Sequence, residues 1–256
     1  MQDTPIVDPK KFIAYLRECG YLKDIKPPKT VVIIFLDSLL KHYCQHFDLK
    51  KVEGFDAGEL YLHADNPAVG VFYCRGVGAP IAIINLEELI AFGVKQFLVV
   101  GTAGALQQHL KVADTVICNS AIRDEGTSQH YNAKSNIAEP APEWQASFKS
   151  FLQRDKKIIE GQTWTTDAPY RETKEKVKAL QQQGVLCVEM EASALFAVAA
   201  FYQVSLSAAF VISDSLADLN WIPGFFSDEV ASSLSTLANE ALDFAMQLTP
   251  STSANY

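Results

Sequence analysis

Residues 185–202 decide the fold, and they read Val-Leu-Cys-Val-Glu-Met-Glu-Ala-Ser-Ala-Leu-Phe-Ala-Val-Ala-Ala-Phe-Tyr. The apolar run 185–188 predicts a short buried strand, and the alanine-rich run that follows predicts a buried helix. Glu189 and Glu191 flank Met190 at the junction between the two. A first-turn Glu191 would favour the helix dipole, which explains one acid but not two. Because carboxylates are costly inside apolar sequence unless they are paired or used, the junction predicts a site.

Strand-like and helix-like segments alternate along the rest of the chain. We expect strands at 31–35, 52–62, 69–73, 95–100, 114–121, 157–163 and 205–213, and helices at 9–19, 38–47, 81–92, 144–152, 172–183 and 228–248. The alternation predicts an α/β fold with a central mixed sheet flanked by helices. Without linker composition or repeats, the sequence predicts one domain at 30–256 and an N-terminal extension at 1–29. Ligands of such sheets bind beyond the carboxyl ends of the strands.

Composition narrows the class of protein. The 256 residues carry a formal net charge of -8 with no basic cluster, which argues against a nucleic-acid partner. The five cysteines are scattered, which is typical of buried thiols in a reducing compartment and predicts no metal site. The chain has no apolar leader and no run near the ~20 residues of a bilayer span, so we expect a cytoplasmic protein without membrane contact.

Two glycine segments and one acid follow predicted strands. Gly76 and Gly78 follow the strand at 69–73, and Gly101-Thr102-Ala103-Gly104 follows the strand at 95–100. Such turns can aim backbone N–H groups at an anion or a sugar, although each alone is better explained as a tight turn. Ser213 and Asp214 end the strand at 205–213, where Asp214 is equally consistent with a cap of the next segment and with a functional acid.

In this order along the chain, the two glycine turns, the Glu-Met-Glu junction and the Ser-Asp strand end resemble the purine/uridine phosphorylase family of nucleoside-cleaving enzymes. The resemblance implies a single-domain, three-layer phosphorylase-like fold. It implies that Glu189, Met190 and Glu191 bind ribose and that Asp214 donates a proton to N7 of the departing purine. The residues that it places at the base are Ala103, Gly104, Tyr170, Val188 and Ser213.

The loop at 161–173 corresponds to the base-stacking loop of that family. Pro169 takes the usual Phe position and Tyr170 follows it, so Tyr170 is our candidate base platform. The Gln-x-Arg of uridine-specific relatives is absent, which together with Asp214 favours purines. Arg171 is at least as consistent with an ion pair to Glu172 or Glu175. In the loop at 123–131, the resemblance implies a structural Arg123 and gives His130 no catalytic role.

The three arginines that bind phosphate in bacterial-type relatives are missing here. Arg75, directly before Gly76, is the candidate replacement, and it is equally consistent with a pair to an acid such as Glu87 or Glu88. If Arg75, Gly76, Gly101 and Thr102 bind phosphate as the co-substrate, the reaction is phosphorolysis. We place phosphorolysis slightly ahead of hydrolysis.

The alternatives are a phosphate-independent nucleosidase of the methylthioadenosine/adenosylhomocysteine type, in which Asp37 activates water, and a non-catalytic nucleoside-binding relative. The resemblance also implies a homo-oligomer, a dimer or hexamer, and no cofactor.

Overall fold

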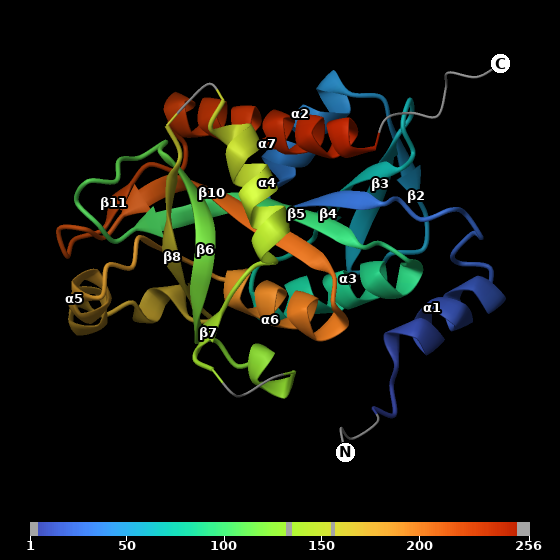
Figure 1. The fold of residues 1–256 in the computed structure, drawn as a ribbon, viewed down its shortest axis with the longest axis horizontal. Helices are drawn as coiled ribbons and strands as arrows, with labels where there is room; N and C mark the ends of the chain where they lie inside the picture. Colours follow the sequence, from blue (N-terminus) through green and yellow to red (C-terminus); the bar gives the residue numbers. More distant parts are fainter. Residues whose placement is uncertain (1–4, 132–134, 155–156, 250–256) are drawn as a thin grey trace.

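The computed structural model describes residues 5–131, 135–154 and 157–249, and a mixed sheet runs through its centre (Figure 1). The strands are β1 (Thr30–Ile34), β2 (Leu49–Val52), β3 (Gly58–His63), β4 (Val69–Cys74), β5 (Gln96–Ala105), β6 (Thr115–Asp124), β7 (Ile137–Ala138), β8 (Ile159–Thr166), β9 (Cys187–Glu189), β10 (Ser205–Ser215) and β11 (Ile222–Pro223). The helices are α1 (Pro9–Glu18), α2 (Asp37–His46), α3 (Ala79–Phe92), α4 (Pro142–Leu152), α5 (Lys174–Gln182), α6 (Ala192–Tyr202) and α7 (Asp228–Leu248).

The strand order is β11-β10-β6-β8-β9-β5-β1-β4-β3-β2, with β7 beside β6. Strand β10 also pairs in parallel with β5 over nearly its whole length. This extra pairing closes β5, β10, β6, β8 and β9 into a ring, from which β1, β4, β3 and β2 extend as an open sheet. The predicted α/β class with a mixed sheet is therefore confirmed.

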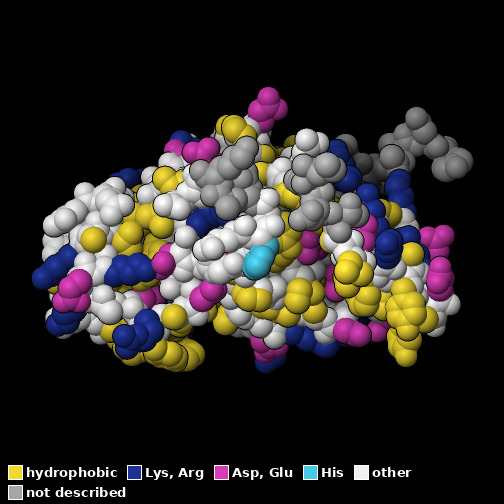
Figure 2. Space-filling model, turned by 90° about the horizontal axis from the view of Figure 1, so that it is seen from below, with side chains coloured by type: hydrophobic (Ala, Val, Ile, Leu, Met, Phe, Trp, Pro, Cys, Tyr) yellow, Lys and Arg dark blue, Asp and Glu magenta, His cyan; other side chains and the backbone are white. Residues whose placement is uncertain are grey.

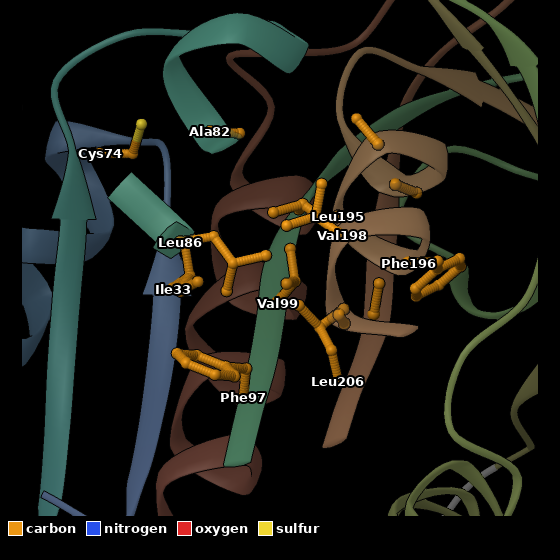
Figure 3. Close-up of a cluster of buried hydrophobic side chains, with 14 of the residues drawn as sticks. Ile33, Cys74, Ala82, Leu86, Phe97, Val99, Leu195, Phe196, Val198 and Leu206 are labelled. Atoms are coloured by element: carbon orange, nitrogen blue, oxygen red, sulfur yellow. The ribbon is translucent and has the colours of Figure 1, made fainter. Parts of the chain in front are cut away.

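Helices cover both faces of the sheet (Figure 1). Helices α1, α3 and α6 pack on one side, and α2, α4 and α7 on the other. Figure 3 shows the first of these layers, where Leu86 of α3 and Leu195 of α6 meet Phe97 and Val99 of β5. Helix α6 is buried on nearly all sides, as its run of alanines and large apolar residues predicts.

Charged side chains are mixed on the surface seen in Figure 2. Lys and Arg are interspersed with Asp and Glu on this face rather than gathered into one stripe. Among the described residues, no helix combines the length and the apolarity that a bilayer crossing requires.

Several predicted boundaries were wrong, and for three of them the structure shows the reason. The expected strand 52–62 is two strands, because the chain turns at Gly54 (φ +105°) and sends Phe55 into the core against Phe72 and Phe92. The glycine segment 101–104 is not a turn but part of β5, because β10 and β9 pair with it from either side. Helix α5 begins at Lys174 rather than 172, since the Thr173 side chain caps it.

The N-terminal segment packs on the rest of the chain. Ile13 and Leu16 of α1 belong to the core layer of α3 and α6, and Leu22 is buried beside them. Pro27 lies so close to Gly93 that a methyl group there would sit 2.7 Å from the proline ring. The division into an extension at 1–29 and a domain at 30–256 stays a prediction.

Candidate active site

Glu189 anchors the junction between β9 and α6. One carboxylate oxygen accepts the backbone N–H groups of Glu191 (2.7 Å) and Ala192 (2.6 Å), and the other accepts the hydroxyl of Thr165 (2.5 Å). Burial raises the pKa of Glu189 to about 7, although these hydrogen bonds pull it downward. With both oxygens bound inside the protein, Glu189 fixes the start of α6 and thereby the neighbouring Met190 and Glu191.

Glu191 joins this junction to the first glycine segment. Its carboxylate accepts the backbone N–H of Gly78, which has φ +100°, a conformation that glycine adopts without strain. A methyl group at Gly78 would come within 4.0 Å of the Met190 side-chain terminus. Burial, followed by the charge of Glu189, raises the pKa of Glu191 to about 8. The predicted sugar-binding motif and the Gly76-Val77-Gly78 turn therefore meet in the structure.

Asp214 lies in β10 with both carboxylate oxygens engaged. The Ser213 hydroxyl donates to Oδ1 (2.8 Å), and the Trp221 indole N–H donates to Oδ2 (2.9 Å). The residue is only 7% exposed, and this burial raises the pKa of Asp214 while the two hydrogen bonds lower it. Burial therefore favours the protonated form of Asp214, which is the form that a general acid requires.

Gly104 connects Asp214 to the Glu-Met-Glu junction. It pairs with Asp214 of β10 on one side and with Val188 of β9 on the other. A methyl group at Gly104 would lie 3.2 Å from Asp214 Oδ2 and 3.2 Å from a Val188 methyl. Since Glu189 follows Val188 directly, the predicted acid and the predicted sugar motif lie at the same end of the sheet.

A buried polar network ties the loop at 123–131 to α6. The Ser193 hydroxyl at the start of α6 donates to Glu125 (3.1 Å), and Glu125 accepts the backbone N–H groups of Thr127 and Ser128. Arg123 donates to the Ser128 hydroxyl (2.8 Å), which agrees with the predicted structural role of this arginine. His130 is exposed. The network thereby supports the start of α6.

Three other predicted site residues are paired elsewhere or exposed. Two of them form ion pairs with residues other than Glu191 and Asp214, and the third is exposed to solvent. Arg75 is about half exposed and its guanidinium is bound to Glu59, so its acid partner is neither Glu87 nor Glu88. Asp37 forms an exposed pair with Lys41 (2.7 Å) in the first turn of α2. Tyr170 is fully exposed in the short turn η2 (Pro169–Arg171). Their assignments to phosphate, water and the base stay predictions.

The sequence profile of the phosphorylase superfamily matches residues 29–245. The chain belongs to this superfamily. It is 33% identical over 177 residues to a DeoD-type purine nucleoside phosphorylase of Bacillus cytotoxicus, which covers 67% of this chain and 72% of that protein. It is 34% identical over 145 residues to the DeoD-type enzyme of Bacillus cereus, covering 55% and 61% of the two chains. The suspected family is thereby confirmed.

Three solved structures share the fold of this chain. Uridine phosphorylase from Vibrio fischeri superposes with a TM-score of 0.73 at 22% identity, covering 88% of this chain and 93% of that one. AMP nucleosidase from Bacteroides thetaiotaomicron gives 0.74 at 19% identity, covering 94% and 98%. Purine nucleoside phosphorylase from Toxoplasma gondii in complex with immucillin-H gives 0.76 at 15%, covering 87% and 92%. At these identities the likeness shows the fold alone.

Two residues of this superfamily member were missed by sequence reasoning. Trp221 contacts Asp214 from the segment after β10, and Glu172 follows η2 and is half-buried near Asp214. Burial, followed by the charge of Asp214, raises the pKa of Glu172 to about 7. The sequence indicates Glu172 only as an ion-pair partner of Arg171. No group of three or more His, Cys, Asp or Glu side chains within the described ranges is arranged to hold a metal ion.

Proposed function

We propose that this protein cleaves the N-glycosidic bond of a purine nucleoside by phosphorolysis, releasing the free base and ribose 1-phosphate. The observation that supports this most is the placement of Asp214 and the Glu-Met-Glu junction on strands that flank Gly104. A sugar held at Glu191 would then present its base toward Asp214. Cleavage passes through an oxocarbenium-like transition state, by analogy with glycoside hydrolysis.

Asp214 would act as the general acid. As the glycosidic bond breaks, its electron pair moves into the purine, and a proton delivered to N7 makes the base a better leaving group. The buried carboxyl group with a raised pKa suits this role. Purine rather than pyrimidine is supported by Asp214 and by the similarity to DeoD-type purine nucleoside phosphorylases.

Glu191 would bind the ribose hydroxyl groups, with Met190 beneath the sugar. Its carboxylate accepts one N–H from the neighbouring glycine segment, which fixes its direction and leaves further lone pairs for hydroxyl donors. Glu189, whose oxygens are occupied by Thr165 and the start of α6, supports this arrangement from behind.

Phosphate would bind at Gly76, Gly101 and Thr102, with Arg75 as the available cation. Arg75 would first have to leave Glu59, and a half-exposed ion pair of this kind costs about 1 kcal/mol or less to break. The same Arg75–Glu59 pair favours a second candidate, hydrolysis, in which water replaces phosphate as the nucleophile.

A panel of purine nucleosides, incubated with and without phosphate and followed by release of the free base, tests the proposal. Base release that depends on phosphate supports phosphorolysis, and equal release without phosphate supports a nucleosidase. Binding without turnover of any nucleoside would refute an enzyme and leave a nucleoside-binding protein. Asp218→Asn, an exposed acid four residues beyond Asp214, is the matched control for site variants.

We also infer a cytoplasmic homo-oligomer. The five cysteines are free, and Cys74, Cys118 and Cys187 are buried as thiols, which suits a reducing compartment. The oligomer rests on the family resemblance, and light scattering of the purified protein measures it.

A further inference from the structure

Trp221 is an exposed tryptophan with a buried partner. Its side chain is 63% exposed, whereas Trp144 and Trp164 are buried at 8% and 1%. The indole N–H of Trp221 nevertheless donates to Oδ2 of the buried Asp214 (2.9 Å). The N–H of an exposed indole can donate to water without being held in one orientation. Its contact with this carboxylate therefore indicates that the surrounding chain positions the indole.

The segment around Trp221 is fixed by backbone contacts on both sides. Strand β11 follows directly and pairs with β10, where Pro223 lies opposite Asp214 and Ile222 opposite Ser215. Gly224 then packs so tightly that a methyl group would lie 2.9 Å from the Ser213 carbonyl oxygen. Before Trp221, Leu219 holds a left-handed conformation (φ +59°), which costs a residue with a Cβ about 1–2 kcal/mol. The chain therefore directs the indole toward Asp214.

A donor at Oδ2 matters because of what happens to Asp214 during proton transfer. Hydrogen bonds to a carboxylate favour its ionised form, whereas burial disfavours it. When the proton leaves the Asp214 carboxyl group for N7 of the purine, a negative charge remains on the aspartate. Within the described part of the chain, the Trp221 N–H and the Ser213 hydroxyl are the side-chain donors that face this charge.

We propose that Trp221 is a positioning residue that makes Asp214 a stronger acid, by holding Oδ2 and stabilising the carboxylate left after the proton has moved to the departing base. This inference rests on the proposed function, since it assigns a partner to the general acid. Trp221 itself neither gives nor takes a proton.

The effect of Trp221 on the titration of Asp214 can be tested because few titratable groups face Asp214. From the turn after η2, Glu172 is the titratable group whose charge interacts with Asp214. Strand β5 faces it with Gly104 and strand β11 with Pro223, neither of which titrates. The charge of Asp214 raises the pKa of Glu172, so Glu172→Gln provides a background in which Asp214 titrates without this acidic neighbour.

The decisive variant is Trp221→Phe, which keeps an aromatic ring and removes the N–H. Without the donor, the pKa of Asp214 rises, so the acid stays protonated to higher pH and becomes a poorer proton donor. The basic limb of kcat/KM against pH should move upward by about half to one pH unit, and kcat should fall about three- to tenfold. Ser213→Ala removes the other donor and should move the limb in the same direction.

Trp144→Phe is the control. The Trp144 indole N–H donates to the carbonyl oxygen of Phe97 (2.9 Å) in the core layer of α2, α4 and α7, which holds none of the proposed site residues. Its loss should leave the basic limb in place. An unchanged limb in Trp221→Phe, or an equal movement in Trp144→Phe, overturns the inference.

A measurement without substrate separates this inference from the proposed function. In protein labelled with ¹³C at the aspartate carboxyl carbons, the resonance lost in Asp214→Asn identifies Asp214, and its titration should shift upward in Trp221→Phe. If the titration shifts while Asp214→Asn cleaves nucleosides at the normal rate, the pairing is right and the proposed acid is wrong. If Asp214→Asn is inactive but the titration does not shift, the proposed function stands and the role of Trp221 fails.

Discussion

Replacing Asp214 by Asn should separate the proposed chemistry from the stability of the fold. Asn has the same shape, and its amide oxygen can accept the Trp221 N–H as Oδ2 does now. Its amide nitrogen would face Ser213, whose hydroxyl can rotate to accept instead of donating. No buried polar atom is left without a partner, so we expect the free energy of unfolding to change by about 1 kcal/mol or less.

Loss of the proton donor should nevertheless reduce purine release strongly. General acid catalysis contributes about 10²- to 10⁴-fold, which corresponds to about 3–5 kcal/mol of activation free energy. Because the Asp214 hydrogen bonds and its 7% exposure are reproduced by Asn, substrate binding should change little and the loss should appear in kcat.

The assay compares kcat and KM for inosine, guanosine and adenosine between the wild type, Asp214→Asn and the exposed control Asp218→Asn. Thermal unfolding of all three proteins checks the fold. An Asp214→Asn variant that retains wild-type kcat on every nucleoside that the wild type cleaves would remove Asp214 from the mechanism.

Three further changes test other parts of the site. The pKa of Glu191 is raised to about 8 from the ~4.3 of an unfolded chain, so its contribution to stability is complete below the unfolded value and is lost as pH rises through 8. Glu191→Gln should therefore flatten the decline of the melting temperature between about pH 5 and 8, and it should weaken nucleoside binding. An unchanged decline of the melting temperature would contradict this effect of burial. Arg75→Ala should raise KM for phosphate, whereas Glu59→Gln, which frees Arg75, should lower KM for phosphate. KM for the nucleoside should stay constant in both variants. If KM for phosphate changes in neither variant, Arg75 is not at the phosphate site. Gly104→Ala places a methyl group 3.0–3.2 Å from Leu216, Asp214 and Val188, so activity should fall on the order of tenfold as Asp214 is displaced, and full activity would show that the spacing between β5 and the acid is not critical.

The sequence contained enough to predict the layers and the junction. Continuous apolar runs identify buried strands such as β1, and the alanine-rich stretch after Glu191 identifies a buried helix, because both signals are local. The predicted single strand at 52–62 failed because residues on both sides of Gly54 have strand propensity, and only the packing of Phe55 shows the break.

The rest of the site depends on contacts between distant segments. The glycine segment at 101–104 reads as a turn, and it becomes strand only because β9 and β10 supply hydrogen-bonding partners. Strand β11 has two residues, too few for any periodicity, so nothing local marks Trp221 as a partner of Asp214. Glu172 beside Arg171 looks like half of a surface ion pair until the fold brings it near Asp214.

The closed ring of β5, β10, β6, β8 and β9 has a consequence for how this site can change. Each strand of the ring is hydrogen-bonded on both sides. The residues of the ring therefore cannot move apart unless backbone hydrogen bonds between its strands break. Asp214 and Gly104 are part of this stiff frame, whereas Glu172 and Trp221 come from the short connections outside it. Exchange of these connections would therefore change the groups around Asp214, while Asp214 and Gly104 keep their positions relative to each other.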